Sequence, residues 1–549
     1  MKTLKIIVAA LMILLTVGTH AQQFVNVNSA GGTGSDRGYD IDKDSYGNTY
    51  VCGWFSETAH FGDVSFDSFG EKDIFIACYD TTGALKWVKQ AGSEGTDVAA
   101  GIVTNSDGYS YLTGWYSSTA DFDTHSITSA GSYDMFVAKY DPEGNCLWAK
   151  SGGGTADDYG NRLTLTNDGG VCVGGSFRET ISVGSHSLTS MGNRDILLAH
   201  FSADGEAVCA KSAGGTGEDR AYGIYQDDDS NYYLTGFYSG TAYFDDIESS
   251  SPSILSSFVA RLDQQGNFQW VRSAGGGAND FARGFSIVPD NEGNIITTGF
   301  FSDRLTVDDI TIFASGGTFD FDIYILKFDN NGTLLWGKNA GGYGTDHARD
   351  LYVDADGKIY VTGFFSGTAY FDGITAEAIG KADVFMARYN NDGSSELLVT
   401  GGGTDNDYGF GIAGDNWGNL ALSGSFYGEA VFGNTTLGSA GANDIFSATI
   451  PGASLGIGHK PAARQLFVYP NPASEQLTVH TGNLFRQGEL LRYRISDTSG
   501  KIRLSSSQTP KTSNDGILLL DISSLNPGAY VIKIFSDNYS LLAKFVVEK

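Results

Sequence analysis

The chain has 549 residues, with 74 glycines, 13% aromatic residues and a formal net charge of −29 at pH 7. Its length allows several domains, while its aromatic content and the lack of a glycine at every third position exclude a disordered chain and a collagen. The negative charge argues against nucleic acid and anionic membrane surfaces as partners.

Residues 1–21 have the features of a secretory signal peptide. A basic start precedes an apolar run over residues 6–17, and Ala21 precedes the expected cleavage site. This run is too short to span a bilayer, so we expect cleavage and a mature chain that begins near Gln22. No later apolar run is long enough for a transmembrane helix, so we predict no transmembrane segment in the mature chain.

Internal repetition dominates residues 22–450. An Ala-Gly-Gly or Gly-Gly-Gly step recurs every 61 residues, with one longer interval. Each repeat contains four runs of alternating apolar residues separated by Gly, Asp and Asn turns, which predicts a four-stranded sheet. A short insert between the second and third runs predicts a small additional hairpin. The seven repeats start at Ala30, Ala91, Gly152, Ala213, Ala274, Ala340 and Gly401.

The two ends of the array indicate how it is completed. The seventh repeat stops at Ile450 after its third strand, whereas residues 22–29 stand where a fourth strand is expected. An unpaired sheet edge invites aggregation, so we expect the N-terminal strand to complete the last sheet. We therefore predict an all-β fold with a closed seven-bladed β-propeller over residues 22–450, and an open β-solenoid of the same repeats is the alternative.

The repeats also resemble a bacterial β-propeller repeat family that is common in secreted proteins. Residues 363–371 (Gly-Phe-Phe-Ser-Gly-Thr-Ala-Tyr-Phe) and 383–389 (Asp-Val-Phe-Met-Ala-Arg-Tyr) carry this resemblance. The resemblance implies a fold and no particular chemistry.

The character of the chain changes after residue 450. Residues 451–464 are small and rich in Gly and Pro, which predicts a linker. Residues 465–549 contain short alternating strands broken by Pro-Asn-Pro, Asp-Thr-Ser-Gly and Asn-Pro-Gly turns, which predicts a small β-sandwich.

Four segments of this last region resemble, in order, the C-terminal sorting domain of type IX secretion substrates in Bacteroidota. They are residues 468–472, 497–500, 525–531 and 544–547. The resemblance implies recognition by the type IX secretion machinery, export across the outer membrane, and release or attachment at the cell surface. The residues that carry the sorting motif are Tyr469, Pro470, Asn471, Pro472, Gly528, Tyr530 and Lys544.

Two sets of aspartates recur in the repeats, and the predicted topology places both on one face of the propeller. The first set could bind a cation such as calcium, or a polyhydroxyl ligand. We favour a structural role, in which each carboxylate accepts backbone N–H groups and joins neighbouring blades. The first set is Asp36, Asp97, Asp158, Asp219, Asp280, Asp346 and Asp407. The second set, with Ser256 in the fourth repeat, is Asp73, Asp134, Asp195, Asp322, Asp383 and Asp444.

The fifth repeat has extra residues. We assign two of them to the turn between its first and second strands and three to the connection that leads to its third strand. Phe313, Phe319 and Phe321 near this connection could stack on a sugar ring or cover a neighbouring blade. Both interpretations remain open.

The sequence predicts no catalytic residue and no resident cofactor. The five cysteines are odd in number, lack metal-ligand spacing and lie mostly in apolar strands, so we expect mostly buried thiols, with at least one that is unpaired or pairs between molecules. No catalytic triad or phosphate loop is present.

We therefore favour an exported, non-enzymatic propeller that binds a glycan or a protein, or is presented at the surface. A polysaccharide lyase or glycoside hydrolase with carboxylates at the propeller mouth is the first alternative, and a hydrolase would need two carboxyls in unlike environments. A structural component of the cell surface is the second.

Overall fold

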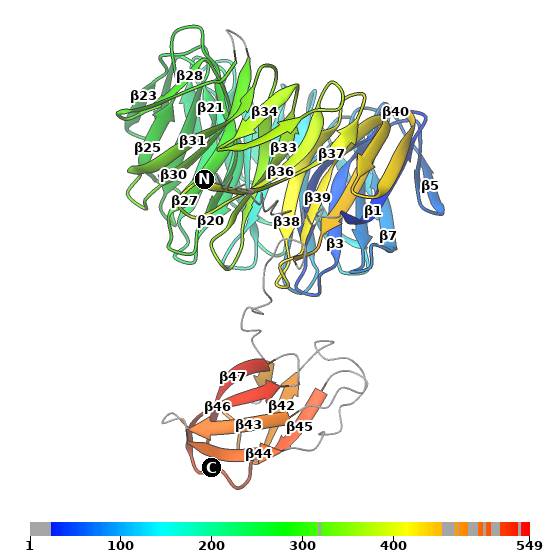
Figure 1. Cartoon of the computed structure of the whole chain (residues 1–549), viewed down its shortest axis with the longest axis vertical. Helices are drawn as coiled ribbons and strands as arrows, with labels where there is room; N and C mark the ends of the chain where they lie inside the picture. Colours follow the sequence, from blue (N-terminus) through cyan, green and yellow to red (C-terminus); the bar gives the residue numbers. More distant parts are fainter. Residues whose placement is uncertain are drawn as a thin grey trace, which may run out of the picture. The chain divides into compact units, whose positions relative to one another are not determined.

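A computed structural model of the chain describes residues 24–316, 320–452, 467–469, 472–480, 492–497, 501–506, 517–535 and 540–548. All regular secondary structure within these ranges is β-strand, which confirms the prediction of an all-β fold (Figure 1). No helix in the described part is long and apolar enough to cross a membrane. The chain divides into two compact units, Met1–Ile457 and Gly458–Lys549. The predicted signal peptide and most of the predicted linker lie outside the described residues.

The first repeat folds as a meander of four antiparallel strands. These are β2 (Arg37–Lys43), β3 (Thr49–Phe55), β6 (Asp73–Tyr79) and β7 (Leu85–Ala91), paired in that order. The two middle strands are buried along their whole length because their β-branched and aromatic side chains pack on both faces of the sheet. Each fully buried side chain of this size contributes about 1.5–3 kcal/mol.

The same order of four strands recurs in the five repeats that follow. The second repeat has β8 (Val98–Thr104), β9 (Ser110–Tyr116), β12 (Asp134–Tyr140) and β13 (Cys146–Gly154). The third has β14 (Tyr159–Leu165), β15 (Val171–Phe177), β18 (Asp195–Phe201) and β19 (Ala207–Gly215). The fourth has β20 (Arg220–Gln226), β21 (Tyr232–Tyr238), β24 (Ser256–Leu262) and β25 (Phe268–Ala274). The fifth has β26 (Ala282–Pro289), β27 (Ile295–Ser302), β30 (Phe321–Phe328) and β31 (Leu334–Gly342). The sixth has β32 (His347–Val353), β33 (Ile359–Phe365), β36 (Asp383–Tyr389) and β37 (Ser395–Gly403).

The insert between the second and third strands forms a hairpin, as expected. This hairpin pairs with the fourth strand of the preceding repeat, and β16, for example, pairs with β13. Each insert therefore joins two consecutive repeats by backbone hydrogen bonds. The hairpins of the first three repeats are β4 (Thr58–Phe61) with β5 (Val64–Asp67), β10 (Thr119–Phe122) with β11 (His125–Thr128), and β16 (Thr180–Val183) with β17 (His186–Thr189). Those of the next three are β22 (Thr241–Phe244) with β23 (Ile247–Ser250), β28 (Arg304–Val307) with β29 (Ile310–Phe313), and β34 (Thr368–Phe371) with β35 (Ile374–Glu377).

The seventh sheet combines both ends of the array. It contains β38 (Tyr408–Gly414), β39 (Leu420–Phe432) and β40 (Thr435–Ile450), and β1 (Val25–Gly32) pairs with β40 from Val25 opposite Thr449 to Ala30 opposite Ile445. In Figure 1 the blue β1 lies beside the gold β40. The first strands of consecutive repeats contact one another, and β38 also contacts β2.

A tryptophan on the fourth strand fastens several repeats to the next one. Trp87 Nε1 donates to the Pro142 carbonyl at 2.9 Å. The indole packs against Gly144 so closely that a Cβ on this glycine would lie only 2.7 Å from Trp87 Cδ2. Gly144 also has a φ of 85°, so only glycine fits this turn without strain. Trp148, Trp270 and Trp336 make the same contact. Cys209 stands at this position in the third repeat and Asn26 in β1.

The extra residues of the fifth repeat lie partly elsewhere than predicted. Arg283 pairs with Phe300 as Arg37 pairs with Trp54, so the two extra residues precede β26, and the turn after β26 has the usual length. Ala282 consequently takes the position held by Asp36 in the first repeat.

The second unit consists of two antiparallel sheets around one core. One sheet has β41 (Phe467–Tyr469), β42 (Gln476–His480) and β45 (Ile517–Asp521). The other has β44 (Ile502–Ser506), β43 (Arg492–Asp497), β46 (Gly528–Phe535) and β47 (Ser540–Val547). Leu477, Ile495 and Ile532, from three of these strands, are buried in the shared core.

The sorting-motif residues lie on the strands of this unit. Tyr469 ends β41, Gly528 begins β46, and Lys544 of β47 pairs with Val531. Tyr530 is buried and its hydroxyl donates to the Asn526 carbonyl at 2.8 Å. Pro472 is exposed, and Pro470 and Asn471 lie outside the described residues.

Candidate functional site

The first aspartate set is buried and binds backbone N–H groups. Asp36 Oδ2 accepts from the Gly32 N–H at 2.8 Å and Oδ1 accepts from the Ser56 N–H at 3.0 Å, which ties the loop before β2 to the end of β3. Asp97, Asp219, Asp346 and Asp407 make the equivalent pair of contacts. Asp158 accepts from the Arg178 N–H at 3.2 Å. Asp280 does not occupy this position and accepts from the Gly277 N–H of its own loop.

The second aspartate set lies against the first. Asp73 Oδ2 accepts from the Phe69 N–H at 2.8 Å, and its Oδ1 has no hydrogen-bond partner. Asp73 Oδ1 and Asp97 Oδ2 lie 2.8 and 3.2 Å from the point where a Cβ on Gly92 would stand, so the two carboxyls face each other. The Oδ1 atoms of Asp134, Asp195, Asp322, Asp383 and Asp444 are also buried and unpartnered.

These paired carboxyls titrate abnormally. Burial raises the pKa of Asp36 to about 7, and the charge of Asp444 adds to this shift. Burial likewise raises the pKa of Asp97 and of Asp73 to about 6. Within the described residues no group of three His, Cys, Asp or Glu side chains could hold a metal ion. The carboxyls therefore act as acceptors inside the repeat junctions and are not presented to solvent.

A cavity of about 500 Å³ lies where the first strands of all seven repeats meet, and we call it the arginine pocket. In the part of the chain that the structure describes, no carboxylate lines it. Its lining residues are Tyr39, Ala100, Trp115, Tyr133, Tyr159, Asn161, Arg162, Arg220, Tyr222, Arg283, Phe285, Arg349 and Phe410.

Seven of these residues share one backbone feature. In every first strand the pairing with the second strand skips a single residue, which is a β-bulge, and the skipped residue lines the pocket. A bulge redirects the side chain of its extra residue, and such devices are common beside functional sites. The bulged residues are Tyr39, Ala100, Asn161, Tyr222, Phe285, Arg349 and Phe410.

Three guanidiniums in and beside this pocket lie over aromatic rings. Arg349 lies 4.5 Å from the Phe285 centroid, Arg283 lies 4.8 Å from that of Phe237, and Arg37 lies 5.1 Å from that of Phe410. Among the described residues none of the three forms an ion pair with a carboxylate, and the Nε of each is buried without a hydrogen-bond partner. An unpaired, partly buried cation is energetically costly.

The charges in the pocket repel one another. Burial and the nearby charges of Arg37 and Arg283 lower the pKa of Arg349 to about 10. Burial and the same kind of repulsion, from Arg349 and Arg283, lower the pKa of His347 well below its usual value, so this ring is neutral. The His347 ring stacks on Phe300 with 3.8 Å between centroids.

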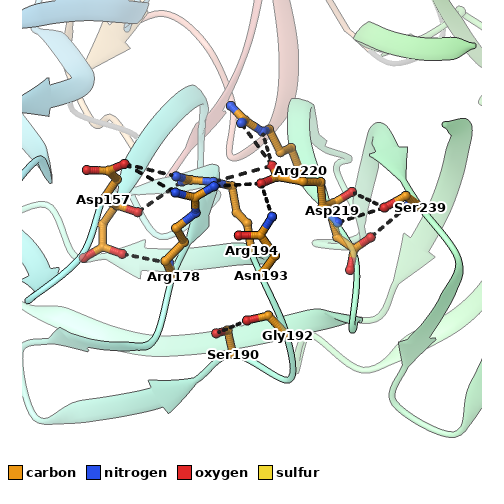
Figure 2. Close-up of polar contacts among 11 residues, drawn as sticks. Asp157, Arg178, Ser190, Gly192, Asn193, Arg194, Asp219, Arg220 and Ser239 are labelled. Atoms are coloured by element: carbon orange, nitrogen blue, oxygen red, sulfur yellow. Dashed lines mark hydrogen bonds and ion pairs between the residues drawn. The ribbon is translucent and has the colours of Figure 1, made fainter. Parts of the chain in front are cut away.

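The two other arginines of the pocket have partners. Arg162 pairs with Asp40, and Arg220 pairs with Glu218 at 3.1 Å. Glu218 also accepts from Arg178 at 2.9 Å. Figure 2 shows Arg178 and the buried Arg194 lying against Asp157 on one side of this network, with Arg220 on the other.

A second cavity of about 450 Å³, which we call the adjoining hollow, shares Arg349 and Phe410 with the pocket. Its other cations are Arg37 and Lys381, of which Lys381 pairs with Asp405 at 2.9 Å, and no carboxylate of the described residues lines it. The bulged residue is the ninth residue after each repeat start, or the eleventh in the fifth repeat. Its type differs from repeat to repeat, whereas the aspartates recur, so the sequence predicted a ring of ligand-binding residues only at the aspartates.

The remaining candidate residues do not line the arginine pocket, and one of them lies outside the described residues. Phe313 is 64% exposed on β29, and Phe319 lies outside the described residues. Phe321 packs on Phe300 with 5.1 Å between centroids, so it belongs to the wall behind the pocket. All five cysteines are free, and only Cys209 among them is exposed.

The second unit has a recognisable family. Residues 467–548 match the secretion system C-terminal sorting domain. The second unit is a sorting domain. The protein is therefore secreted or held at the cell surface through type IX secretion.

The repeats have distant relatives. The chain is 23% identical over 360 residues to an uncharacterized WD repeat-containing protein of Acanthamoeba polyphaga mimivirus, which covers 53% of this chain and 26% of that protein. It is 26% identical over 211 residues to the regulatory protein FlaEY of Caulobacter vibrioides, which covers 37% and 22% respectively. The chain thus spans about a quarter of the length of these curated relatives.

Among solved structures, the chain is similar to PorZ of Porphyromonas gingivalis, described as an essential surface component of the type IX secretion system. The two share 13% identity and a TM-score of 0.32, over 95% of this chain and 75% of PorZ.

Proposed function

We propose that the protein is an exported, non-enzymatic binding protein whose repeats form a closed seven-bladed β-propeller and whose arginine pocket holds an anionic ligand. We also propose that residues 1–21 are a signal peptide, that residues 451–464 are a linker, and that the protein comes from a member of the Bacteroidota. The sorting motif around Tyr469 and Tyr530 directs the chain to the type IX machinery.

Two observations support closure. The strand β1 pairs with β40 and supplies the fourth strand of the seventh sheet. The first strand β2 contacts both β8 and β38, so each first strand has two neighbouring first strands. An open solenoid would leave β2 and β38 at opposite ends of the array.

The observation that carries the binding role is that the guanidiniums of Arg37, Arg283 and Arg349 form no ion pair with any carboxylate of the described residues, and that their Nε atoms are buried without a partner. The chain has 64 acidic and 35 basic residues, yet among those that the structure describes no carboxylate lines the arginine pocket or the adjoining hollow. A bound anion would pair with these cations, and charge-assisted bonds to guanidinium groups are among the stronger polar contacts in proteins.

One enzymatic alternative has support from the pocket. A lyase that acts on acidic polysaccharides must neutralise a sugar carboxylate and move a proton, and arginine and tyrosine can do both. Tyr39, Tyr159 and Tyr222 line the pocket beside the guanidiniums. Release of unsaturated sugar ends by the purified chain would identify this activity. The hydrolase alternative would need a pair of carboxyls in the pocket, whereas the aspartates are bound to backbone N–H groups.

Calorimetric titration of the mature chain with a panel of organic and inorganic anions tests the binding role. We expect at least one anion to bind, and we expect the double variant Arg283→Gln/Arg349→Gln to bind it at least about tenfold more weakly. The matched control is Lys150→Gln. Lys150 lies on β13 and forms an exposed ion pair with Glu206, from which the substitution removes one charge. A ligand that binds equally well to the double variant would refute the pocket as the binding site.

A further inference from the structure

We propose that the ligand of the arginine pocket is the end of an acidic oligosaccharide, with one carboxylate-bearing sugar ring in the pocket and the next ring in the adjoining hollow. This inference rests on the proposed binding function and specifies its ligand. Four features support it: the side chains of the bulged residues, the number of arginines without an ion pair among the described residues, the acidic side chains that follow the bulges, and the lining of the two cavities.

Four of the seven bulged residues have aromatic rings, and one is an arginine. Tyr39, Tyr222, Phe285 and Phe410 present aromatic surface, and Arg349 stands between the last two in chain order. Aromatic faces favour the apolar C–H face of a sugar ring, and guanidiniums favour carboxylates in a planar, two-bonded geometry. A ligand that offers both features at once is a sugar acid.

The number of free cations limits the charge of the ligand. Within the described part of the chain Arg37, Arg283 and Arg349 form no ion pair, whereas Arg162 and Arg220 are neutralised by Asp40 and Glu218. Only a few negative charges can therefore be matched. The net charge of −29 on the whole chain repels a long, densely charged polymer such as a nucleic acid. A short chain end with one charge on each ring meets both conditions.

Acidic side chains further along the first strands limit how far the carboxylate of the ligand can enter the pocket. Asp40 and Asp42 follow the bulge of β2, and Asp350 follows that of β32. Asp42 is held by the Thr104 N–H at 2.6 Å, and Asp350 by the Ile412 N–H at 3.1 Å. Asp40 is the partner of Arg162, so an anion that moves past Arg162 meets acidic side chains and not a further guanidinium of the pocket. The carboxylate of the ligand is therefore held at the level of the bulges.

The adjoining hollow accounts for the length of the ligand. It begins at Arg349 and Phe410, where it meets the pocket, and continues to Arg37, Phe364 and Lys381. A single sugar ring fills only part of the two cavities, which together are comparable to the binding site of a drug-sized molecule. A second ring can stack beside Phe364 while its carboxylate faces Arg37. An oligosaccharide end should bind more tightly than a free monosaccharide.

Calorimetric titration with defined sugars tests this assignment on the full mature chain. The probes are di- and trimers of galacturonic acid, the matching neutral galactose oligomers, a galactose dimer that carries a sulfate ester and no carboxylate, and a nucleoside monophosphate. We expect the galacturonate oligomers to bind at least about tenfold more tightly than the neutral oligomers. A sulfated disaccharide that binds as tightly as galacturonate would assign the charge to sulfate and overturn the carboxylate assignment.

One variant separates sugar binding from anion binding. Phe410→Ala removes the ring that both cavities share, and we expect it to weaken galacturonate binding about tenfold and leave sulfate or phosphate binding unchanged. Circular dichroism and the thermal midpoint of each variant check that it is folded. If inorganic anions or the nucleotide bind at Arg283 and Arg349 and no sugar does, the ligand assignment is wrong and the proposed function stands. If no anion binds, both are wrong.

Discussion

The guanidinium of Arg349 lies over the ring of Phe285, with 4.5 Å between its central carbon and the ring centroid. Both residues are the bulged residues of their first strands, β32 and β26. The aromatic ring compensates only part of the desolvation of the cation, since no carboxylate among the described residues pairs with it. The contact therefore holds a positive charge at the centre of an acidic protein.

Replacement of Arg349 should stabilise the protein while it impairs binding. Arg349→Gln removes a partly buried charge that Arg37 and Arg283 repel. We expect the free energy of unfolding to rise by about 1 kcal/mol. Urea denaturation measures this change, with Lys150→Gln as a control that should have almost no effect. A loss of stability in Arg349→Gln would show that the charge has a structural partner.

The stability of the repeats should decrease as the pH rises. The pKa of Asp36, Asp219 and Asp407 is raised by burial from 3.8 to about 7. Their contribution to stability is complete below about pH 4, where they are protonated in both states, and is lost as the pH rises through 7, because only the unfolded state ionises freely. Thermal unfolding should show a higher midpoint at pH 5 than at pH 8. A midpoint that does not change, or that increases with pH, would contradict the raised pKa values.

A single amide should relieve one of these carboxyl pairs. In Asp73→Asn the side-chain oxygen still accepts from the Phe69 N–H, and the new NH₂ group replaces the unpartnered Oδ1 that faces Asp97. We expect about 1 kcal/mol of added stability at pH 8 and almost none at pH 5. Urea denaturation at the two pH values measures it.

The neighbouring aspartate should respond in the opposite way. Both oxygens of Asp97 accept N–H donors, from Ser93 at 2.6 Å and Ser117 at 3.0 Å. Asp97→Asn would point an NH₂ group at one of them, so we expect a loss of about 2 kcal/mol. Equal effects of the two substitutions would contradict the assigned hydrogen bonds.

The sequence predicted the β-strands and their order because a 61-residue repetition displays the same pattern many times. It did not predict the arginine pocket. Arg283 and Arg349 both lie nine residues after the starts of their repeats, Ala274 and Ala340, yet only Arg349 is a bulged residue. Only the pairing across β26 and β27 shows that the two extra residues precede Arg283 and bring it to the place of Arg37. The side-chain partners of a charge depend on such three-dimensional alignments.

The junction between the third and fourth repeats should accept a tryptophan. Cys209 occupies the position of Trp148, and a small cavity of about 40 Å³ lies beside it, next to Gly266. Cys209→Trp should bury the indole on Gly266 and donate Nε1 to the Gln264 carbonyl, which would stabilise the protein by about 1–2 kcal/mol. Thermal denaturation measures the gain, and Cys209→Ser should be nearly neutral. A lower midpoint for the tryptophan variant would mean that the junction is too tightly packed to open.

Loss of the N-terminal anchor should destabilise the whole first unit. Phe24 is 5% exposed and its ring meets that of Phe432 edge to face at 5.5 Å. We expect Phe24→Ala to cost about 3 kcal/mol in one cooperative transition. The matched control is Phe313→Ala, because Phe313 is 64% exposed and should contribute less than about 0.5 kcal/mol. A small effect at Phe24 would argue against a ring that β1 closes.

A crystal structure of the mature chain with a bound trimer of galacturonic acid would test the binding site most directly. We predict one sugar carboxylate within hydrogen-bond distance of Arg283 and Arg349, with the ring against Phe285 or Phe410. A trimer bound elsewhere on the protein, with the guanidiniums of Arg283 and Arg349 facing only water, would contradict the assignment of the arginine pocket as the ligand site.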